Sequence, residues 1–266
     1  MENYRKHLVR EGLSDNTIDS YVWTATHFME KYGTASEETV TAYKEHLLGN
    51  YSAQTVNLRL LALNRYLAYK GRPDLKARLI RRTRKSFLEN VISDADYRYM
   101  KTRLRKEGKT GWMYTVWFLA ATGARVSELR EIKAEHVRQG YLDLYSKGGK
   151  LRRVYIPKRL REESAVWLRE RGIESGYIFL NRFGERLTAR GIAQQLKRLA
   201  RRYGLRPAVV YPHSFRHLFA RNFLDRRKDI AMLADLMGHE SIETTRIYLR
   251  RTAGEQQKQV DIIVDW

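Results

Sequence analysis

The chain has 266 residues, a length that allows one large core or two modest ones, and two domains are the starting expectation. Its formal net charge of +21 and pI near 10.2 mean that a compact chain would repel itself unless a polyanion neutralised it. Nucleic acid is therefore the leading class of partner, ahead of an anionic membrane surface. The absence of cysteine excludes disulfides, thiolate nucleophiles and cysteine zinc fingers, and it fits a reducing cytoplasm.

Membrane association is not expected. The sequence contains no stretch of about 18 apolar residues, and the opening MENYRKHLVREGLS does not resemble an amphipathic anchor. We therefore expect a soluble, unprocessed, cytoplasmic protein. Proline is scarce, while Leu, Glu, Lys and Arg are common, which favours helix over strand. The predicted fold is mainly α with a small β-ribbon.

Residues 1–75 are predicted to form a helical bundle. After a short first helix near Tyr4, the segment LSDN offers an N-cap to a run whose apolar residues recur every 3.6 positions, as in an amphipathic helix. Ser36 and Ser52 can cap two further helices, and the last of them is expected to end at Gly71. Four helices suffice for a compact first domain.

Residues 76–92 are predicted to be a basic linker. The run KARLIRRTRK within it places six basic residues in ten without an acid. Such a run is most often a solvated surface, but between two basic domains it can also contact a DNA backbone. The sequence does not identify base-reading residues. From charge alone, phosphate contacts are assigned to Arg59, Arg65, Lys76, Arg81, Arg82, Arg84 and Lys85.

Residues 93–250 are predicted to form a second, mixed α/β domain. Ser93 can cap its first helix, and a strongly apolar helix follows at residues 112–121. The segment YLDLY alternates with period two, Gly148-Gly149 supplies a turn and RVYI returns, which predicts a hairpin. Further helices are expected at residues 160–171, 188–203, 214–224, 228–237 and 242–250.

The residues that could perform chemistry are weak signals when taken singly. Arg125 and Glu128 are three residues apart and can share one face of a helix, but a pair with this spacing can equally be a structural ion pair without a catalytic role. His213 and Arg216 stand one turn apart at a helix start that favours an anion, although an isolated pair of this kind is usually incidental. His213 and His217 have the spacing of zinc ligands, but the glutamate of a zinc protease is missing, and no metal is expected.

The order and spacing of the whole set are more informative. The segments TGARVSEL, SKGGK followed by RRVYIP, PHSFRH and LMGHESIETTRIYL resemble the motifs of the tyrosine recombinase family, which includes phage integrases and chromosome-dimer-resolving recombinases of bacteria. The resemblance spans residues 93–250, and the first domain more loosely resembles that family's DNA-clamping, core-binding domain. It implies a site-specific DNA recombinase whose catalytic set here would be Arg125, Lys147, His213, Arg216, His239 and Tyr248.

The residue types suit that chemistry. Displacement at a phosphodiester builds negative charge on the non-bridging oxygens, which Arg125 and Arg216 can stabilise with forked guanidinium groups. A phenol must lose its proton as it attacks, so Tyr248 would pass a proton toward His213 and form a covalent phosphotyrosine. A lysine on a hairpin can protonate the departing sugar oxygen. Lys150 is the alternative lysine, but Lys147 matches the Ser-Lys-Gly position of the family.

The resemblance supplies the remaining roles. His239 would donate a hydrogen bond to the phosphate, and Glu128 would orient its neighbours. The family joins to the 3′ phosphate and exchanges strands inside a tetramer. We therefore expect double-stranded DNA with inverted-repeat-like core sites, a homotetramer, accessory DNA-bending proteins and no cofactor. The outcome is left open between integration, excision, inversion and dimer resolution.

Residues 251–266 are predicted to be a C-terminal tail, and the residues at its end are too apolar for a free tail in water. The tail could dock on a neighbouring protomer or on its own catalytic domain. Two other functions are compatible with the same sequence features. A type IB topoisomerase would share the chemistry without choosing a site, and a DNA-binding regulator would bind without cutting.

Overall fold

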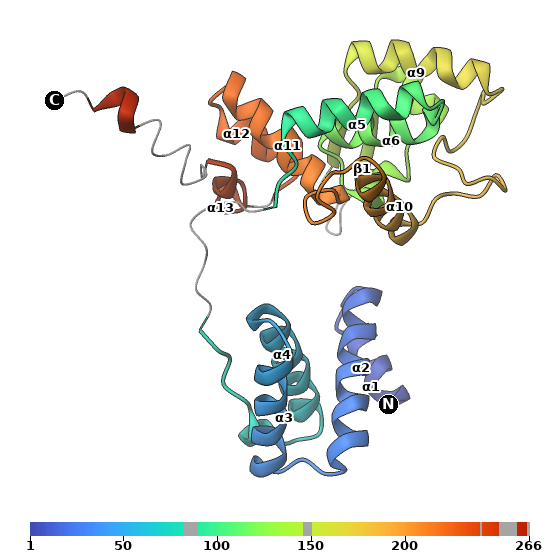
Figure 1. Cartoon of the computed structure of the whole chain (residues 1–266). Helices are drawn as coiled ribbons and strands as arrows, with labels where there is room; N and C mark the ends of the chain where they lie inside the picture. The colour runs from blue at the N-terminus through green and yellow to red at the C-terminus, as the bar shows by residue number, and fades with distance from the viewer. Residues whose placement is uncertain (82–89, 146–150, 240, 250–259, 265–266) are drawn as a thin grey trace. The chain divides into compact units, whose positions relative to one another are not determined.

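The computed structural model describes residues 1–81, 90–145, 151–239, 241–249 and 260–264. The chain divides into two compact units, residues 1–84 and residues 85–266 (Figure 1). The described residues are mostly helical, with one two-stranded antiparallel sheet. The fold class predicted from the sequence is confirmed. Among the described residues no helix is long and apolar enough to cross a membrane.

The first unit contains four helices, α1 to α4, followed by a 3-10 turn, η1. Their apolar faces meet in one core that includes Tyr4, Phe28 and Tyr43. Ser36 and Ser52 accept hydrogen bonds from the backbone N–H groups of Thr39 and Thr55, as predicted for N-caps. The elements are α1 Glu2–Arg10, α2 Asp15–Tyr32, α3 Glu37–Asn50, α4 Ala53–Tyr69 and η1 Pro73–Leu75.

The beginning of the predicted linker packs on the first unit. Ala77 is buried in its core. Asn64 of α4 donates to the Ala77 carbonyl at 2.9 Å and accepts from the Ala77 N–H at 2.8 Å, and Asn57 binds Ile80 in the same two ways at 2.9 Å each. The two asparagines are seven positions apart, so they lie on one face of α4. Each asparagine side chain thus satisfies the backbone N–H and carbonyl of one residue of this segment, as a neighbouring β-strand would do.

Replacing Asn64 should loosen that segment locally. Asn64→Ala removes the acceptor of the Ala77 amide, and a lost hydrogen bond of about 1–1.5 kcal/mol corresponds to roughly tenfold faster amide exchange. Hydrogen–deuterium exchange of the whole protein, resolved at Ala77 and Ile80, would measure this effect. Asn57→Ala is the matched control and should speed exchange at Ile80 instead. Unchanged exchange at Ala77 in Asn64→Ala would contradict the interpretation.

The core of the second unit forms around α6 Thr110–Thr122. This helix is apolar on nearly every side because neighbours cover it on several faces: α5 Asp94–Lys106, α9 Lys158–Glu170 and α11 Pro212–Arg226 all pack against it. Two short helices, α7 Val126–Leu129 and α8 Ala134–Gln139, follow α6 along the chain. α10 Ala189–Arg202 adds Ile192, Leu196 and Leu199 to the same core.

The predicted β-ribbon lies beside these helices. Strands β1 Tyr141–Tyr145 and β2 Leu151–Tyr155 pair antiparallel, with Leu142 opposite Val154 and Leu144 opposite Arg152. The expected turn at Gly148-Gly149 lies outside the described residues. Successive side chains of a strand point to opposite faces, so Arg152 shares a face with the buried Val154, whereas Arg153 does not.

The last described helices form a small core of their own. α11, α12 Ile230–Met237, α13 Ile242–Arg246 and the 3-10 turn η2 Ile247–Leu249 pack together (Figure 1). Ala220, Leu224, Leu233 and Met237 are buried there with Tyr248. The single helix expected at residues 242–250 is thus a short α-helix that tightens into a 3-10 turn. That turn places Tyr248 against α11.

Candidate active site

Arg125 is positioned by the end of α6. The helix stops at Gly123, which adopts a left-handed conformation with φ of 62° and lies so close to Phe219 that an added Cβ would be 2.5 Å from its ring. Two residues later Arg125 is the N-cap of α7, where its backbone N–H and Nη1 both donate to Glu128, at 2.7 Å each. Its side chain is 43% exposed, so the guanidinium can still reach a ligand.

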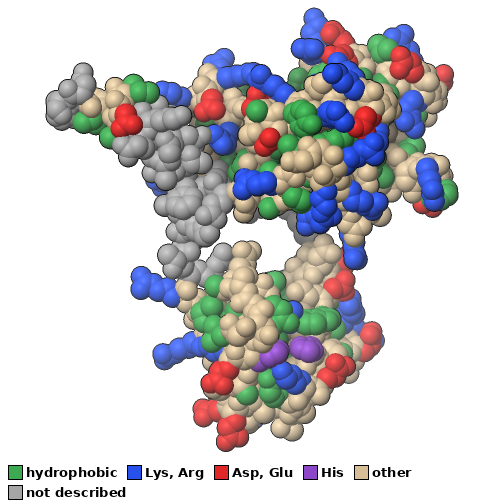
Figure 2. Space-filling view, in the orientation of Figure 1, with side chains coloured by type: hydrophobic (Ala, Val, Ile, Leu, Met, Phe, Trp, Pro, Cys, Tyr) green, Lys and Arg blue, Asp and Glu red, His purple; other side chains and the backbone are tan. Residues whose placement is uncertain are grey.

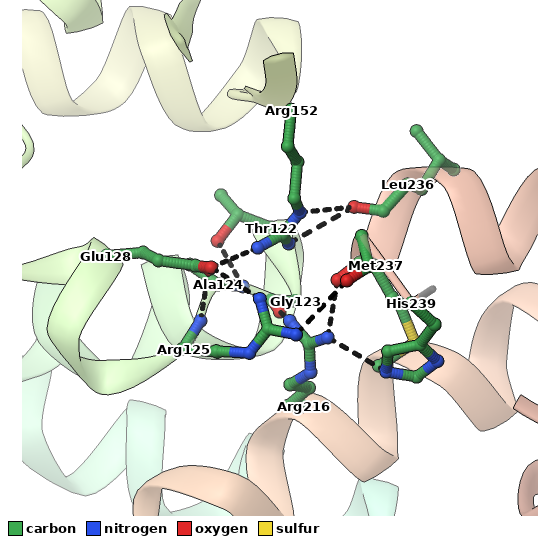
Figure 3. Close-up of polar contacts among 11 residues, drawn as sticks. Thr122, Gly123, Ala124, Arg125, Glu128, Arg152, Arg216, Leu236, Met237 and His239 are labelled. Carbon is green, nitrogen blue, oxygen red and sulfur yellow. Dashed lines mark hydrogen bonds and ion pairs between the residues drawn. The ribbon is translucent and has the colours of Figure 1, made fainter. Parts of the chain in front are cut away.

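Arg216 lies on the first turns of α11 and is 1% exposed. Nη1 donates to the Gly123 carbonyl at 2.7 Å, and Nη2 donates to the Met237 carbonyl at 2.6 Å (Figure 3). Nη2 also lies 3.0 Å from His239 Nε2, while Nε is buried with no hydrogen-bond partner. Burial, then the charges of Arg125 and Arg152, lowers the pKa of Arg216 to about 10. The group therefore stays charged at neutral pH.

Arg152 of β2 is a site residue that was not predicted from the sequence. Its side chain is 10% exposed and forms an ion pair with Glu128. Nε and Nη2 each donate to the Leu236 carbonyl at 3.2 Å (Figure 3). The signal was available, because the alternation in RRVYIP puts Arg152 on the inward face with Val154. An arginine on a buried face needs a partner, and here that partner is Glu128.

Glu128 is buried between the two arginines. Burial by itself would raise the pKa of its carboxyl group, but the charge of Arg152 and the hydrogen bonds from Arg125 and Arg152 outweigh burial and lower the pKa. Glu128 is therefore ionised. The three guanidinium groups and this one carboxylate leave a formal excess of two positive charges, which makes the centre suited to an anion.

The C-terminal end of α12 connects the three arginines. Its carbonyls at Leu236, Met237 and Gly238 accept from Arg152, Arg216 and Arg125 respectively. The last carbonyls of a helix have no partner within the helix and carry the negative end of its dipole, so cations stabilise them. The same interactions bring β2, α11 and the start of α7 to one place.

His239 follows directly after α12. Gly238 ends that helix in the left-handed conformation with φ of 60°. His239 Nδ1 lies 2.7 Å from Thr245 Oγ1, and Nε2 faces Arg216. Since a guanidinium can only donate, Nε2 accepts and Nδ1 carries the proton. Burial, then the charges of Arg216 and Arg125, lowers the pKa of His239 to about 4, so the ring is neutral.

Tyr248 lies in the same chain as the arginines and close to them. It is 5% exposed, its ring centroid is 6.2 Å from that of His239, and the two planes are 11° apart. Burial raises the pKa of its hydroxyl group, while the charges of Arg216 and Arg125 oppose that rise. The phenol is therefore neutral at rest, but it lies in a field that favours the phenolate.

His217 of α11 packs against Tyr248, and His213 lies next to His217 one turn earlier on the same helix. The buried ring of His217 lies 5.2 Å from the Tyr248 ring and 4.5 Å from the His213 ring. Part of the His213 side chain is open to solvent, and the desolvation of the rest, then the charges of Arg216 and Arg125, lowers its pKa. Among the described residues, no cluster of three or more His, Asp or Glu side chains is arranged to hold a metal.

Five of the six predicted catalytic residues thus surround one centre. The described chain brings together Arg125, His213, Arg216, His239 and Tyr248, with the predicted orienting residue Glu128 among them. Lys147 lies outside the described residues.

The residues guessed to contact DNA phosphates have mixed surroundings. Arg59 is stacked between the Trp23 and Tyr51 rings at 4.3 Å from each, and Arg65 forms an ion pair with Glu11 at 2.7 Å. Lys76 and Arg81 are exposed. Arg82, Arg84 and Lys85 lie outside the described residues.

A basic face of α10 was also not predicted. Its inner positions are apolar, and the opposite face exposes Arg190, Lys197, Arg198 and Arg201. Within the described part of the chain these four form no ion pair that would neutralise them. Figure 2 shows Lys and Arg side chains over much of the visible surface of the second unit. The helical period of ARGIAQQLKRLARR could have identified this face.

Comparison with known proteins decides the family. The model described as the phage integrase family matches residues 85–255. The chain belongs to the phage integrase family. Tyrosine recombinase XerA of Pyrococcus furiosus is 31% identical over 268 residues, which cover 98% of this chain and 92% of the relative. Tyrosine recombinase XerD of Oceanobacillus iheyensis is 26% identical, with 92% of this chain and 90% of the relative covered.

Solved structures agree in fold. XerH site-specific recombinase bound to its difH substrate matches with a TM-score of 0.70 and 22% identity, covering 92% of this chain and 79% of that one. A lambda integrase dimer bound to a COC′ core site matches with a TM-score of 0.71 and 18% identity, covering 95% and 94%. The predictions of family, recombinase fold and enzyme class are therefore confirmed.

The burial of His217 predicts an acid-sensitive fold. Burial, then the charges of His213 and Arg216, lowers its pKa to about 4 from an ordinary value of 6.5. Between these values the unfolded chain binds a proton that the folded chain does not. Stability is therefore fully present above pH 6.5 and falls as the pH drops toward 4.

His217→Phe should flatten that dependence. The substitution keeps a ring between His213 and Tyr248, and the buried Nδ1 has no hydrogen-bond partner to lose. In urea unfolding followed by tryptophan fluorescence, the slope of unfolding free energy against pH should decrease by up to about 1 kcal/mol per pH unit between pH 4 and 6.5. Above pH 7 the curves of the two proteins should be parallel. An unchanged slope in the acid range would show that His217 titrates normally.

Proposed function

We propose that this protein cuts and rejoins DNA at specific sites through a covalent bond between Tyr248 and a 3′ phosphate. The observation that carries the proposal is the position of the Tyr248 phenol. Its ring stacks on that of His239, whose Nε2 is 3.0 Å from Arg216 Nη2, and the charges of Arg216 and Arg125 of the same chain act on its hydroxyl group. A nucleophile and an anion site thus occur together without help from a second subunit.

The arginines would hold the scissile phosphate. Arg216 has a buried Nε with no partner, and the Arg125 guanidinium is partly exposed, so both have N–H groups left for phosphate oxygens. These donors are fixed in advance by the end of α12, and charge that develops on the non-bridging oxygens would meet them without rearrangement. The excess positive charge of the centre supports the same role.

His239 would also donate a hydrogen bond to the phosphate once DNA is bound. Its Nε2 accepts from Arg216 in this structure, so donation to a phosphate requires the other tautomer. When a phosphate oxygen accepts the Arg216 Nη2 hydrogen that points to His239, Nη2 keeps its bond to the Met237 carbonyl. Nε2 of His239 can then carry the proton, and Nδ1 can accept from the Thr245 hydroxyl group. Thr245 is fully buried and is placed to make either hydrogen bond.

The reaction is balanced by two proton transfers. Tyr248 Oη forms a bond to phosphorus as its proton passes to His213, and the bond from phosphorus to the 5′ oxygen breaks. Lys147 would protonate that departing oxygen. The phosphotyrosine conserves the bond energy, and attack by a 5′ hydroxyl group reverses the steps to rejoin a strand.

The assembly follows from the same proposal. The exposed cations of α10, together with Lys76 and Arg81, would contact double-stranded DNA with inverted-repeat-like core sites. The first unit would act as a DNA clamp, four copies would assemble on DNA, and accessory proteins could bend it. Val260, Ile262 and Ile263 are strongly exposed, which supports docking of the C-terminal segment on a neighbouring protomer.

Tyr248→Phe is the direct test. The full-length protein is incubated with fragmented genomic DNA, and the reaction is stopped with detergent. The covalently attached DNA is then recovered and sequenced. The unmodified protein should yield adducts at one recurring sequence. Tyr248→Phe should yield none, because the oxygen that bonds to phosphorus is gone, while its DNA affinity in a gel-shift assay stays within about twofold.

Other outcomes would support the rival functions. Adducts without a recurring sequence, with relaxation of any plasmid by a monomer, would favour a type IB topoisomerase. DNA binding with no adduct from the unmodified protein would favour a regulator. Adducts that persist in Tyr248→Phe would assign the nucleophile to another residue.

A further inference from the structure

The guanidinium of Arg152 is the only one of the three at the end of α12 that the proposed reaction does not use. It is buried on the inward face of β2 and binds two separate elements at once: the Glu128 carboxylate of α7 and the Leu236 carbonyl of α12 (Figure 3). Arg125 and Arg216 bind the next two carbonyls of the same helix end. A buried charge of this kind is costly unless each of its partners is well placed.

We propose that Arg152 is a positioning residue for the phosphate site, which shares the Glu128 carboxylate with Arg125 and fixes the end of α12 from which His239 emerges. This inference rests on the proposed function. Arg152 itself is not assigned a contact with DNA. It acts through the two groups that it holds.

Arg152 takes a share of the negative charge of Glu128. Arg152 Nη1 and Arg125 Nη1 both bind Glu128 Oε1, while Glu128 Oε2 accepts from the Arg125 backbone N–H. With Arg152 present, one negative charge is divided between two cations, so Arg125 keeps part of its attraction for a phosphate. Without Arg152, Glu128 would pair with Arg125 alone, and the formal excess of positive charge would drop from two to one.

Arg152 also fills the space beside the turn that ends α12. The stem of Arg152 lies so close to Gly238 that a Cβ on that residue would overlap Arg152 Cδ. Gly238 also has a positive φ and gives its carbonyl to Arg125. Arg152 thus packs against the turn that holds Arg125 on one side and leads to His239 on the other. A shorter or straighter side chain would leave that turn without support.

The shape of the guanidinium group suits its two partners. Arg152 binds in two directions, with Nη1 toward Glu128 and with Nε and Nη2 toward Leu236. A planar guanidinium can serve both partners, whereas the single ammonium group of lysine can hold only one of them firmly. Lysine would therefore keep the charge but lose part of the positioning.

The neighbouring residue provides a matched control. Arg153 lies on the opposite face of β2 and makes two hydrogen bonds of 2.7 Å to Asp143. Its side chain is 37% exposed, and it also stacks on the Tyr141 ring. It therefore matches Arg152 in residue type, strand and number of carboxylate partners but has no link to α7 or α12 among the described contacts.

The test compares Arg152→Gln, Arg152→Lys and Arg153→Gln in the full-length protein. The probe is a duplex of the recurring sequence recovered by covalent trapping, nicked so that the adduct accumulates. We measure the single-turnover rate of adduct formation, the DNA affinity and the folded fraction. Arg152→Gln should slow adduct formation on the order of 100-fold, as misplacement of about 1 Å can do. DNA affinity should change less than threefold, because most DNA contacts lie elsewhere.

The conservative variant and a second substitution sharpen the test. Arg152→Lys should lose less rate than Arg152→Gln, and Arg153→Gln should stay within twofold of the unmodified protein. Adding Glu128→Gln to Arg152→Gln should cost less than the product of the two single effects, because both act through one contact. Adding it to Arg153→Gln should multiply the two effects.

Three results would overturn the inference: a folded Arg152→Gln that forms the adduct at the normal rate, a loss that follows only the unfolded fraction or DNA affinity, or full multiplication with Glu128→Gln. If Arg152→Gln does not fold, Arg152→Lys decides, and a normal rate in that variant overturns the inference. An unmodified protein that forms no adduct overturns the proposed function itself, which is a separate and recognisable failure.

Discussion

The site depends on one set of hydrogen bonds, in which three arginines donate to three successive carbonyls at the end of α12. Arg152, Arg216 and Arg125 come from a strand, a helix and a helix start, and each donates to one carbonyl of Leu236, Met237 or Gly238. A helix end has orphan carbonyls and a negative dipole, so it satisfies the donors and offsets part of their mutual repulsion. Like charges can therefore lie close together before DNA arrives.

Two helix stops place the reactive groups around this cluster. Gly123 ends α6 and Gly238 ends α12, both in the left-handed conformation and both pressed against a neighbour that leaves no room for a Cβ. Arg125 follows the first stop and His239 the second. Arg216 binds the Gly123 carbonyl as well as that of Met237, so it links the two stops directly. The turns that end the helices thus set the geometry of the site.

Local patterns in the sequence were sufficient for the elements and for most of the site. Serine caps, glycine stops and the alternation of YLDLY gave the helices and the ribbon, because these signals act over a few residues. The motif order gave Arg125, His213, Arg216, His239 and Tyr248 as one set.

The partners of individual charged side chains were harder to predict. The charge of Arg59 and Arg65 predicts phosphate contacts, but it does not predict that one is stacked between aromatic rings and that the other pairs with Glu11, because tertiary packing sets those contacts. Contacts between residues far apart in the sequence are not visible in local patterns. For this reason neither the role of Arg152, whose partner Glu128 is 24 residues earlier, nor the docking of Ala77 on α4 was predicted.

The proposed reaction requires that Tyr248 act with the arginines of its own chain. A mixture of two inactive proteins, Tyr248→Phe and Arg216→Ala, tests this claim on the sequence that the unmodified protein cleaves. If the phenol and the guanidinium must come from one chain, each mixed assembly contains no complete site, and adduct formation should stay at background at every mixing ratio. Recovery of adducts in the mixture, with a maximum near equal amounts, would show that the tyrosine is supplied from a neighbouring subunit and would contradict the account.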